Sequence, residues 1–305
     1  MDPSDITLHQ FVDGSDPERC LAEIQAIMAL AAPEALDLGL FVPVWQDVLR
    51  LFHGRFPGYR ASNTLYHNLE HTCSVVLAMA RLLHGLTLGG HPLSCRALLL
   101  GLYAALFHDT GLIQEEGDQE GSGAKYTVGH EERSIALMQR VLAGRGLPAA
   151  DLEDCRHLIR ATILSLSLRE IPFRDREMAL VGQAMGSADL LAQMADPRYL
   201  DKLPLLFKEF QEGGLSGYRS EQELVDKTEE FYYLVAQRRL HEELGGVFRF
   251  MRLHFRARWG VDRDLYSEAI EANMIHLRQI QDRCGTDSLC TLAELGRSHP
   301  DSDGG

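Results

Sequence analysis

The sequence predicts an all-α protein, and two observations carry that prediction. Apolar residues recur at spacings of three and four along most of the 305-residue chain, which is the period of an amphipathic helix. No stretch of useful length alternates apolar and polar residues, and no hairpin signal is present. The chain also lacks a fixed-period repeat. We therefore expect one helical domain over residues 1–297 and a disordered tail over 298–305.

The first helices can be placed from their start signals. Asp16 followed by Pro17 predicts a helix over Pro17–Ala31, and apolar periodicity predicts a second over Val44–Phe56. A polar break follows over Tyr59–Thr64. Its last residues can cap a third helix, which we expect to carry two histidines, at positions 67 and 71.

Further helices are expected along the rest of the chain, interrupted by a Gly-rich, charged loop over 115–129 that should be mobile. A core over about 60–215 and a carboxyl-terminal helical extension over about 220–285 are predicted. The helical segments are 97–107, 130–144, 151–168, 177–195, 203–212, 221–244 and 267–284.

The amino-acid composition and net charge limit the kinds of binding partner that we expect. Hydrophobic residues make up 45% and charged residues 24%, as in ordinary globular proteins. The formal net charge of −14 repels phosphate backbones, so no nucleic-acid partner is expected. The amino terminus lacks a leader pattern, and the longest apolar run, Ala97–Phe107, is too short to span a bilayer. We expect a cytoplasmic protein without a membrane partner, and homo-oligomer formation stays open.

The six cysteines are scattered and form no C-x-x-C pair. This spacing suggests neither a structural zinc site nor a disulfide framework. Reduced thiols, most of them buried, are therefore expected.

The stretch "TLYHNLEHTCSVV" contains the first residues that could bind a metal or act as an acid or base. On a helix, His67 and His71 would lie on one face, about one turn apart. They could be two metal ligands, or one ligand beside one acid/base group. With Glu70 the stretch also spells H-x-x-E-H, the inverted zinc-protease motif.

The stretch "ALFHDTGL" is the second informative segment. A very apolar helix runs directly into His108 and Asp109, and burying a charged Asp there is costly unless a partner compensates it. A metal ion would satisfy both residues. Alternatively, Asp109 and Thr110 simply begin a turn that Gly111 closes. Asp189 lies farther along, among the apolar residues of "GSADLLAQM", where an acid needs a partner. Alternatively, Asp189 caps a helix or faces solvent.

The order H…HD…D resembles the HD superfamily of metal-dependent phosphohydrolases, which are helical enzymes. "YHNLEHTCSVV" is also similar to the first metal motif of class I cyclic-nucleotide phosphodiesterases, Y-H-N-x-x-H-A-x-D-V. It departs from that motif at Thr72, where the family has Ala, and at Ser74, where it has Asp. The matching positions are Tyr66, His67, Asn68, His71 and Val75.

The resemblance implies an HD-domain/PDEase-like helical bundle with additional carboxyl-terminal helices, and it implies roles for single residues. His71, His108, Asp109 and Asp189 would bind the metal, and His67 would protonate the departing oxygen. His67 and Asp109 are thus the catalytic candidates. One or two divalent ions are implied, and Mn, Fe, Zn, Co and Mg all suit such mixed ligands.

Other candidates are weaker. His130, in "GHEERSIALM", resembles a histidine of small bacterial HD proteins that binds a second metal or the substrate phosphate, or it is only the first residue of a helix. His157 occupies the place of a further ligand in some dinuclear relatives, although a satisfied histidine is the simpler interpretation. The residues that could line a pocket are Tyr66, Asn68, Arg160 and Thr162.

The predicted function is hydrolysis of a small phosphate ester, a nucleotide-type phosphomonoester or phosphodiester, by metal-activated water. The H-D-x-x-H continuation of the phosphodiesterases is absent, because Leu112 and Ile113 follow HDTG. This departure leaves open a non-catalytic HD module that senses or scaffolds. An inverted-motif zinc protease and a di-iron oxygenase are the remaining alternatives. The protease would leave His108 and Asp109 unexplained.

Overall fold

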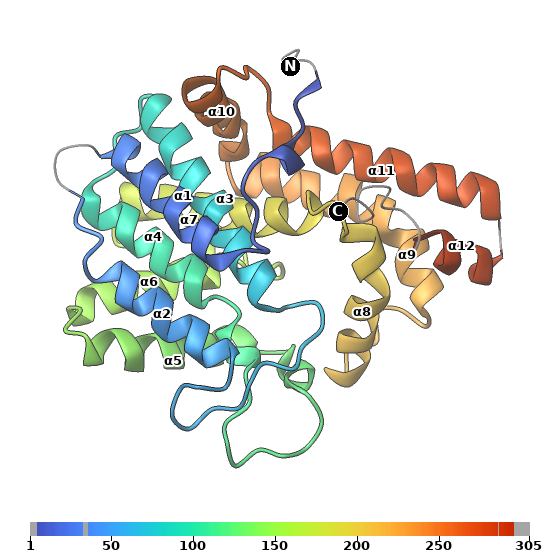
Figure 1. The fold of residues 1–305 in the computed structure, drawn as a ribbon, viewed down its shortest axis with the longest axis horizontal. Helices are drawn as coiled ribbons and strands as arrows, with labels where there is room; N and C mark the ends of the chain where they lie inside the picture. Colours follow the sequence, from blue (N-terminus) through green and yellow to red (C-terminus); the bar gives the residue numbers. More distant parts are fainter. Residues whose placement is uncertain (1–4, 33–35, 286, 296–305) are drawn as a thin grey trace.

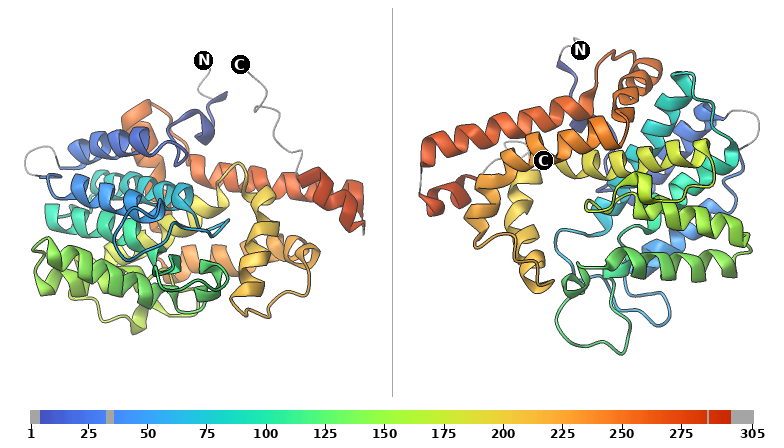
Figure 2. Two further views of the ribbon diagram at one scale, coloured as in Figure 1. Left: turned by 60° about the horizontal axis from the view of Figure 1, so that its bottom comes forward. Right: turned by 180° about the vertical axis from the view of Figure 1, so that it is seen from behind.

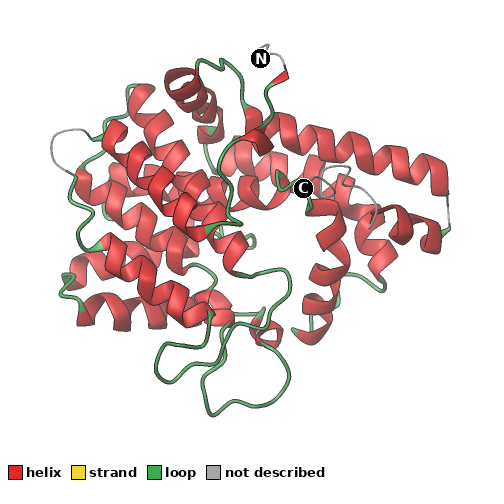
Figure 3. Cartoon of the chain, in the orientation of Figure 1, coloured by secondary structure: helices red, strands yellow, loops and turns green. Residues whose placement is uncertain are grey.

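The computed structural model describes residues 5–32, 36–285 and 287–295. The chain is 69% helical and has no strand among these residues, which confirms the all-α class (Figure 3). The expected tail over 298–305 lies outside the described residues. The α-helices are α1 (Pro17–Ala31), α2 (Phe41–Phe52), α3 (Leu69–Leu88), α4 (Cys95–Phe107), α5 (His130–Gly144), α6 (Ala149–Arg160), α7 (Arg176–Met194), α8 (Tyr199–Glu212), α9 (Glu221–Glu230), α10 (Met251–Trp259), α11 (Leu265–Cys284) and α12 (Ser288–Leu295).

Helix α3 is the centre of the larger group of helices, and it packs against α1, α4, α7 and α10. Helices α8, α9 and α12 form a second group beside α1–α7, with α11 running along its upper edge (Figure 1). The views from below and from behind show the same separation (Figure 2). Glu209 of α8 contacts Tyr66 and His67, which directly precede Asn68 and the start of α3, so a site there can draw residues from both groups.

By length and composition alone, α3 could cross a membrane, but 78% of its most apolar window is buried inside the protein. A helix that packs on four neighbours has the apolar composition of a core element. Its hydropathy is thus explained by burial in the fold.

The start of α3 differs from the sequence expectation. Asn68 is the N-cap: its side-chain oxygen accepts a hydrogen bond from the backbone N–H of His71 at 3.1 Å. The helix therefore begins at Leu69, after His67. The prediction of both histidines on one helix was wrong, because Asn68 satisfies an orphan N–H of the first turn better than the polar residues upstream.

Helix α4 ends where the sequence indicated. His108 follows its last residue, and Asp109 precedes a short 3₁₀ helix, η3 (Thr110–Leu112). Gly111 is required there, because a Cβ at this position would lie 2.0 Å from the carbonyl oxygen of His130. Its N–H donates to Ser134 Oγ at 2.8 Å. The glycine thus lets α5 approach the Asp109 turn.

The carboxyl-terminal helices contain two departures from expectation. The segment expected as one helix over 221–244 consists of α9 and two π-helical stretches, η6 (Phe231–Ala236) and η7 (Arg239–Glu243). Cys284 and Cys290 form a disulfide, which corrects the expectation of reduced thiols throughout. Helix α12 packs on α11, and the two Cα atoms lie 5.5 Å apart, within bridging range. Spacing rules based on C-x-x-C do not detect such a pair.

Candidate metal centre and adjoining cavity

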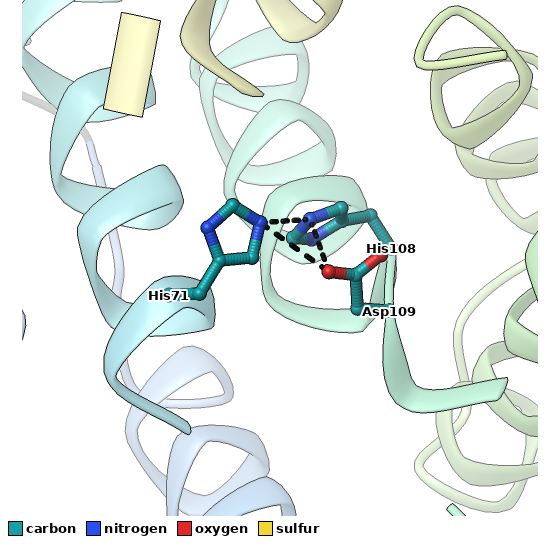
Figure 4. A group of neighbouring side chains, drawn as sticks. All are labelled: His71, His108 and Asp109. Carbon is teal, nitrogen blue, oxygen red and sulfur yellow. Dashed lines mark hydrogen bonds and ion pairs between the residues drawn. The ribbon is translucent and has the colours of Figure 1, made fainter. Parts of the chain in front are cut away.

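Three of the predicted ligands meet where α3 begins and α4 ends. His71 projects from the first turn of α3, and His108 and Asp109 follow α4; one donor atom of each lies within 4.8 Å of the others. The two Nε2 atoms are 3.4 Å apart. Asp109 Oδ2 lies 3.3 Å from the Nε2 of His71 and 3.1 Å from that of His108. Figure 4 shows the three side chains directed toward one point.

Asp189 extends this cluster. It lies on α7, which packs along α3, and its Oδ1 is 3.5 Å from His71 Nε2 and 3.6 Å from His108 Nε2. Asp189 does not belong to the compact group of His71, His108 and Asp109. Its contacts with this group are to the two histidines. The fold therefore brings together the four residues that the HD resemblance implies as ligands.

The donor atoms fit a divalent cation. His108 Nδ1 is 2.9 Å from the carbonyl oxygen of Ala105, so it donates there and leaves the Nε2 lone pair facing the cluster. Asp109 Oδ2 is buried and accepts no hydrogen bond although two Nε2 atoms are near it. Ligands about 2.1 Å from one ion are separated by about 3.0 Å at right angles and about 3.4 Å in a tetrahedron. The separations among the donor atoms of His71, His108 and Asp109, 3.1–3.4 Å, match those values.

Electrostatics support the same conclusion. Burial lowers the pKa of His71 and His108, but Asp109 and Asp189 outweigh burial, and both histidine pKa values are raised. Burial raises the pKa of the two carboxyls, yet the histidines hold both pKa values below the usual range. Without a cation, protons compensate the cluster's negative charge. A cation would displace those protons, so its affinity should rise with pH.

His130 is also placed in the site. Its Nε2 is 3.2 Å from Asp109 Oδ1, and its Nδ1 donates to the carbonyl of Thr127 at 2.8 Å. Burial lowers its pKa, but Asp109 more than offsets this and raises the pKa of His130 to about 9. Asp109 therefore faces the ligand cluster with one oxygen and His130 with the other. A second metal or a phosphate oxygen remains the prediction for His130.

His67 forms a pair with Glu209, a residue that the sequence did not indicate. Its Nδ1 is 2.6 Å from Glu209 Oε2, while Glu209 Oε1 accepts the backbone N–H of Tyr66 at 2.7 Å. The His67 ring lies 5.7 Å from the ring of His71. Glu209 is 3% exposed on α8. The sequence signal for Glu209 was an acidic residue on the apolar face of "LPLLFKEFQE". That signal does not indicate which residue the acid will contact.

Four weaker candidates lie outside the site's lining. Asn68 caps α3 and so positions His71 through the backbone. Arg160 donates to Glu132 at 2.7 Å, and His157 Nε2 lies 3.2 Å from Glu153 Oε1. Tyr66 is 4% exposed, with its ring edge against His67. The expectation that Tyr66, Asn68 and Arg160 line the pocket was wrong, since helix capping, ion pairing and core packing use those side chains.

Glu70, the acid of the H-x-x-E-H motif, does not face the cluster. Its carboxylate is paired with Arg198 and, at 3.3 Å, with Lys202, both beyond α7. These partners hold the pKa of Glu70 below its usual value although burial opposes them. The spacing therefore does not make Glu70 a base beside the histidines.

A cavity of about 390 Å³ opens beside the cluster. His67, Asp109, His130 and Asp189 line one end, and Thr162 is the predicted pocket residue that reaches it. The helix expected over 151–168 ends at Arg160, and the turn that follows forms part of the cavity wall.

Arg239, 3% exposed, holds this turn. Its guanidinium donates to the carbonyls of Ala161, Ile163 and Leu164 at 2.8–3.0 Å and of Leu166 at 3.3 Å. The sequence did not indicate the role of Arg239, because an arginine in a highly charged helix is expected to be exposed to solvent.

Comparison with known proteins adds one finding. A protein-family model described as Npun_R2479-like matches residues 151–248, less than half of the chain. No curated protein matches the chain. The matched segment includes Asp189, Glu209, Arg239 and most of the cavity wall, whereas His71 and the His108–Asp109 pair precede it.

Proposed function

We propose that this protein is a metal-dependent phosphohydrolase of the HD superfamily. The observation that carries the proposal is the arrangement of two units on one cavity. A cluster of two histidines and two carboxylates suits a divalent cation, and the His67–Glu209 pair stands beside it. A cation site next to a carboxylate-oriented histidine supplies the two requirements of phosphate-ester hydrolysis, which are charge neutralisation and protonation of the departing oxygen.

The residues divide the chemistry as follows. A divalent cation held by the cluster would polarise the phosphoryl group and acidify a water molecule. The water oxygen forms a bond to phosphorus while the bond from phosphorus to one ester oxygen breaks. His67 gives its proton to that departing oxygen. A carboxylate of the cluster, for which Asp109 is the candidate, takes up the proton that the water loses.

Glu209 sets the orientation of His67. Its carboxylate accepts the Nδ1 proton, so the opposite nitrogen, Nε2, remains to carry the transferable proton. Because Glu209 Oε1 is itself fixed by the Tyr66 N–H, the pair is held from two sides. Glu209 thus acts as a positioning residue for the acid.

The alternatives gain less support. The protease hypothesis needs Glu70 near the histidines, and Glu70 pairs with Arg198 and Lys202 instead. The buried carboxylate directed at His67 supports a catalytic acid more than a non-catalytic module. No contact among the described residues favours a di-iron oxygenase over a hydrolase.

The proposal is tested with metal-loaded protein and a panel of phosphate monoesters and diesters. The native protein should release product with at least one ester class in the presence of Mn, Fe, Zn, Co or Mg. A His108→Ala variant should lose both bound metal and turnover, while a His276→Ala variant, altered on α11 outside the cluster and the cavity lining, should retain them. Absence of turnover with every ester and metal would contradict the proposal.

A further inference from the structure

The cavity beside the cluster has two chemically different ends. At one end are Asp109 and Asp189 of the cluster, with His67 and His130 beside them. The rest of the wall comes from the turn after α6, from α7, α8, α9 and η6, and from the segment between α8 and α9, and it is largely apolar. The side chains that make this apolar end are Leu190, Leu203, Leu206, Phe210, Leu224 and Phe231. Such a wall gains free energy by covering apolar surface of a ligand, roughly in proportion to the area removed from water.

Apolar side chains also continue from the cavity to the surface. Leu164 and Leu215 line the cavity and are 46% and 39% exposed. Val128, next to the lining residue Thr127, is 67% exposed. Exposed apolar residues that adjoin an apolar cavity indicate that the bound group extends toward the mouth.

The charges of the lining limit the ligand further. None of the described residues that line the cavity is a lysine or an arginine, whereas Asp109, Glu131 and Asp189 are acidic. Lys227 lies over the Tyr218 ring at 6.0 Å, but its ammonium is paired with Glu223 at 3.2 Å. Sites that bind several phosphates use Arg or Lys to compensate each added charge. Among the described residues, the lining therefore offers positive charge only at the cluster end.

We propose that the substrate is a singly charged phosphate diester with an apolar ester group, such as an alkyl or lipid-like chain, that fills the Leu206–Phe210 end of the cavity. The proposal rests on the proposed function and replaces the nucleotide expected from sequence. Water adds to phosphorus, one ester bond breaks, and the departing oxygen takes the His67 proton. The products are a phosphomonoester and an alcohol.

The first experiment measures kcat/KM of the metal-loaded full chain for p-nitrophenyl methyl, butyl and octyl phosphates. Each methylene that enters the apolar end should raise kcat/KM about threefold to fourfold until the cavity is full. Nucleoside monophosphates and triphosphates should be turned over more slowly than the butyl diester. Equal kcat/KM for the methyl and octyl esters, or faster turnover of a nucleotide, would overturn the proposal.

A matched pair of variants locates the effect. Leu215→Asp places a charge on an exposed cavity residue in the loop after α8 and should reduce the octyl-to-methyl ratio at least about tenfold. Leu234→Asp, at a 62% exposed position outside the lining, should leave the ratio unchanged. An equal ratio in both variants would place the apolar group elsewhere and refute the assignment.

A binding measurement separates this inference from the proposed function. The butyl(methyl)phosphinate and octyl(methyl)phosphinate anions carry one negative charge. Both carbon groups are joined to phosphorus by P–C bonds, so these compounds contain no ester bond and cannot be hydrolysed. Calorimetry should show tighter binding of the octyl compound, weakened by Leu215→Asp. Tight binding without hydrolysis of any ester would contradict the hydrolase and uphold the ligand class. Equal binding of the two phosphinates would overturn the ligand class whether or not esters are hydrolysed.

Discussion

Helix α3 contributes to two buried histidine pairs with opposite properties. Near its start, His71 faces His108, with two carboxylates beside them. Near its end, His84 Nδ1 is 2.9 Å from His254 Nδ1, and among the described residues no carboxylate forms an ion pair with either histidine. The pKa values of the first pair are raised, whereas those of the second are lowered.

The difference shows what makes a buried histidine pair able to bind a metal. Burial acts on both pairs in the same direction and disfavours the charged forms. Carboxylates reverse this effect at His71 and His108. At His84 and His254, burial is reinforced by the neighbouring Arg258, and for His254 also by Arg81. The surrounding charges, more than the histidines themselves, decide whether a cation or a neutral hydrogen bond is favoured.

The largest expected effect comes from making the first pair resemble the second. An Asp109→Asn, Asp189→Asn double variant removes both carboxylates, so metal affinity should fall at least about a thousandfold. Metal content after dialysis and calorimetric titration measure this. Asp196→Asn, which alters an acid paired with Lys202 outside the cluster, is the control and should retain metal. Undiminished affinity in the double variant would contradict the ligand assignment.

The next effect concerns rate at constant metal. His67→Ala should keep the metal and lower kcat about a hundredfold to ten-thousandfold for an alkyl ester, because its departing oxygen needs a proton. The loss should be smaller for a p-nitrophenyl ester, whose departing oxygen is less basic. Glu209→Gln should cause the same pattern at about tenfold to a hundredfold. Equal losses for both esters would argue against His67 as the acid.

The second histidine pair predicts a pH dependence of stability. Burial, with Arg81, His84 and Arg258, lowers the pKa of His254 to about 2, while the unfolded chain binds this proton near pH 6.5. The stability is therefore fully present above about pH 6.5 and falls as pH decreases, by up to about 1.4 kcal/mol per pH unit.

Denaturant unfolding between pH 7 and pH 4 measures that slope. A His254→Phe variant, whose ring would still contact Phe255, should show a shallower slope, since the titrating group is gone. An unchanged slope would mean that other groups cause the acid sensitivity.

The smallest effect is expected at Glu70. Glu70→Gln loses a partly exposed ion pair with Arg198 and Lys202, which should cost no more than about 1 kcal/mol in the free energy of unfolding. Metal content and kcat should stay at the native level. A large loss of kcat would support the inverted zinc-protease interpretation of His67, Glu70 and His71. It would contradict the view that the charges around the His71–His108 pair define the site.

Sequence patterns predicted the fold class, and the resemblance to the HD superfamily indicated the candidate ligands. Apolar spacing of three and four predicted the helices, because burial of one helix face imposes that period locally. An Asp beside a His at the end of an apolar helix, and another Asp among apolar residues, marked Asp109 and Asp189 as acids that need partners. The start of α3 was misplaced, since several polar residues compete to cap a helix and only their geometry decides among them.

Tertiary structure alone supplied the rest. His67 and Glu209 are 142 residues apart, and a buried acid on a helix face does not state what it will contact. The approach of α5 at Gly111, which brings His130 to Asp109, depends on two backbones meeting in space. The apolar end of the cavity is likewise formed by several helices. The apolar residues of each helix, taken separately, predict only that this face packs in the core. Local periodicity tells which residues are buried, and only the packing of distant helices decides what they are buried against.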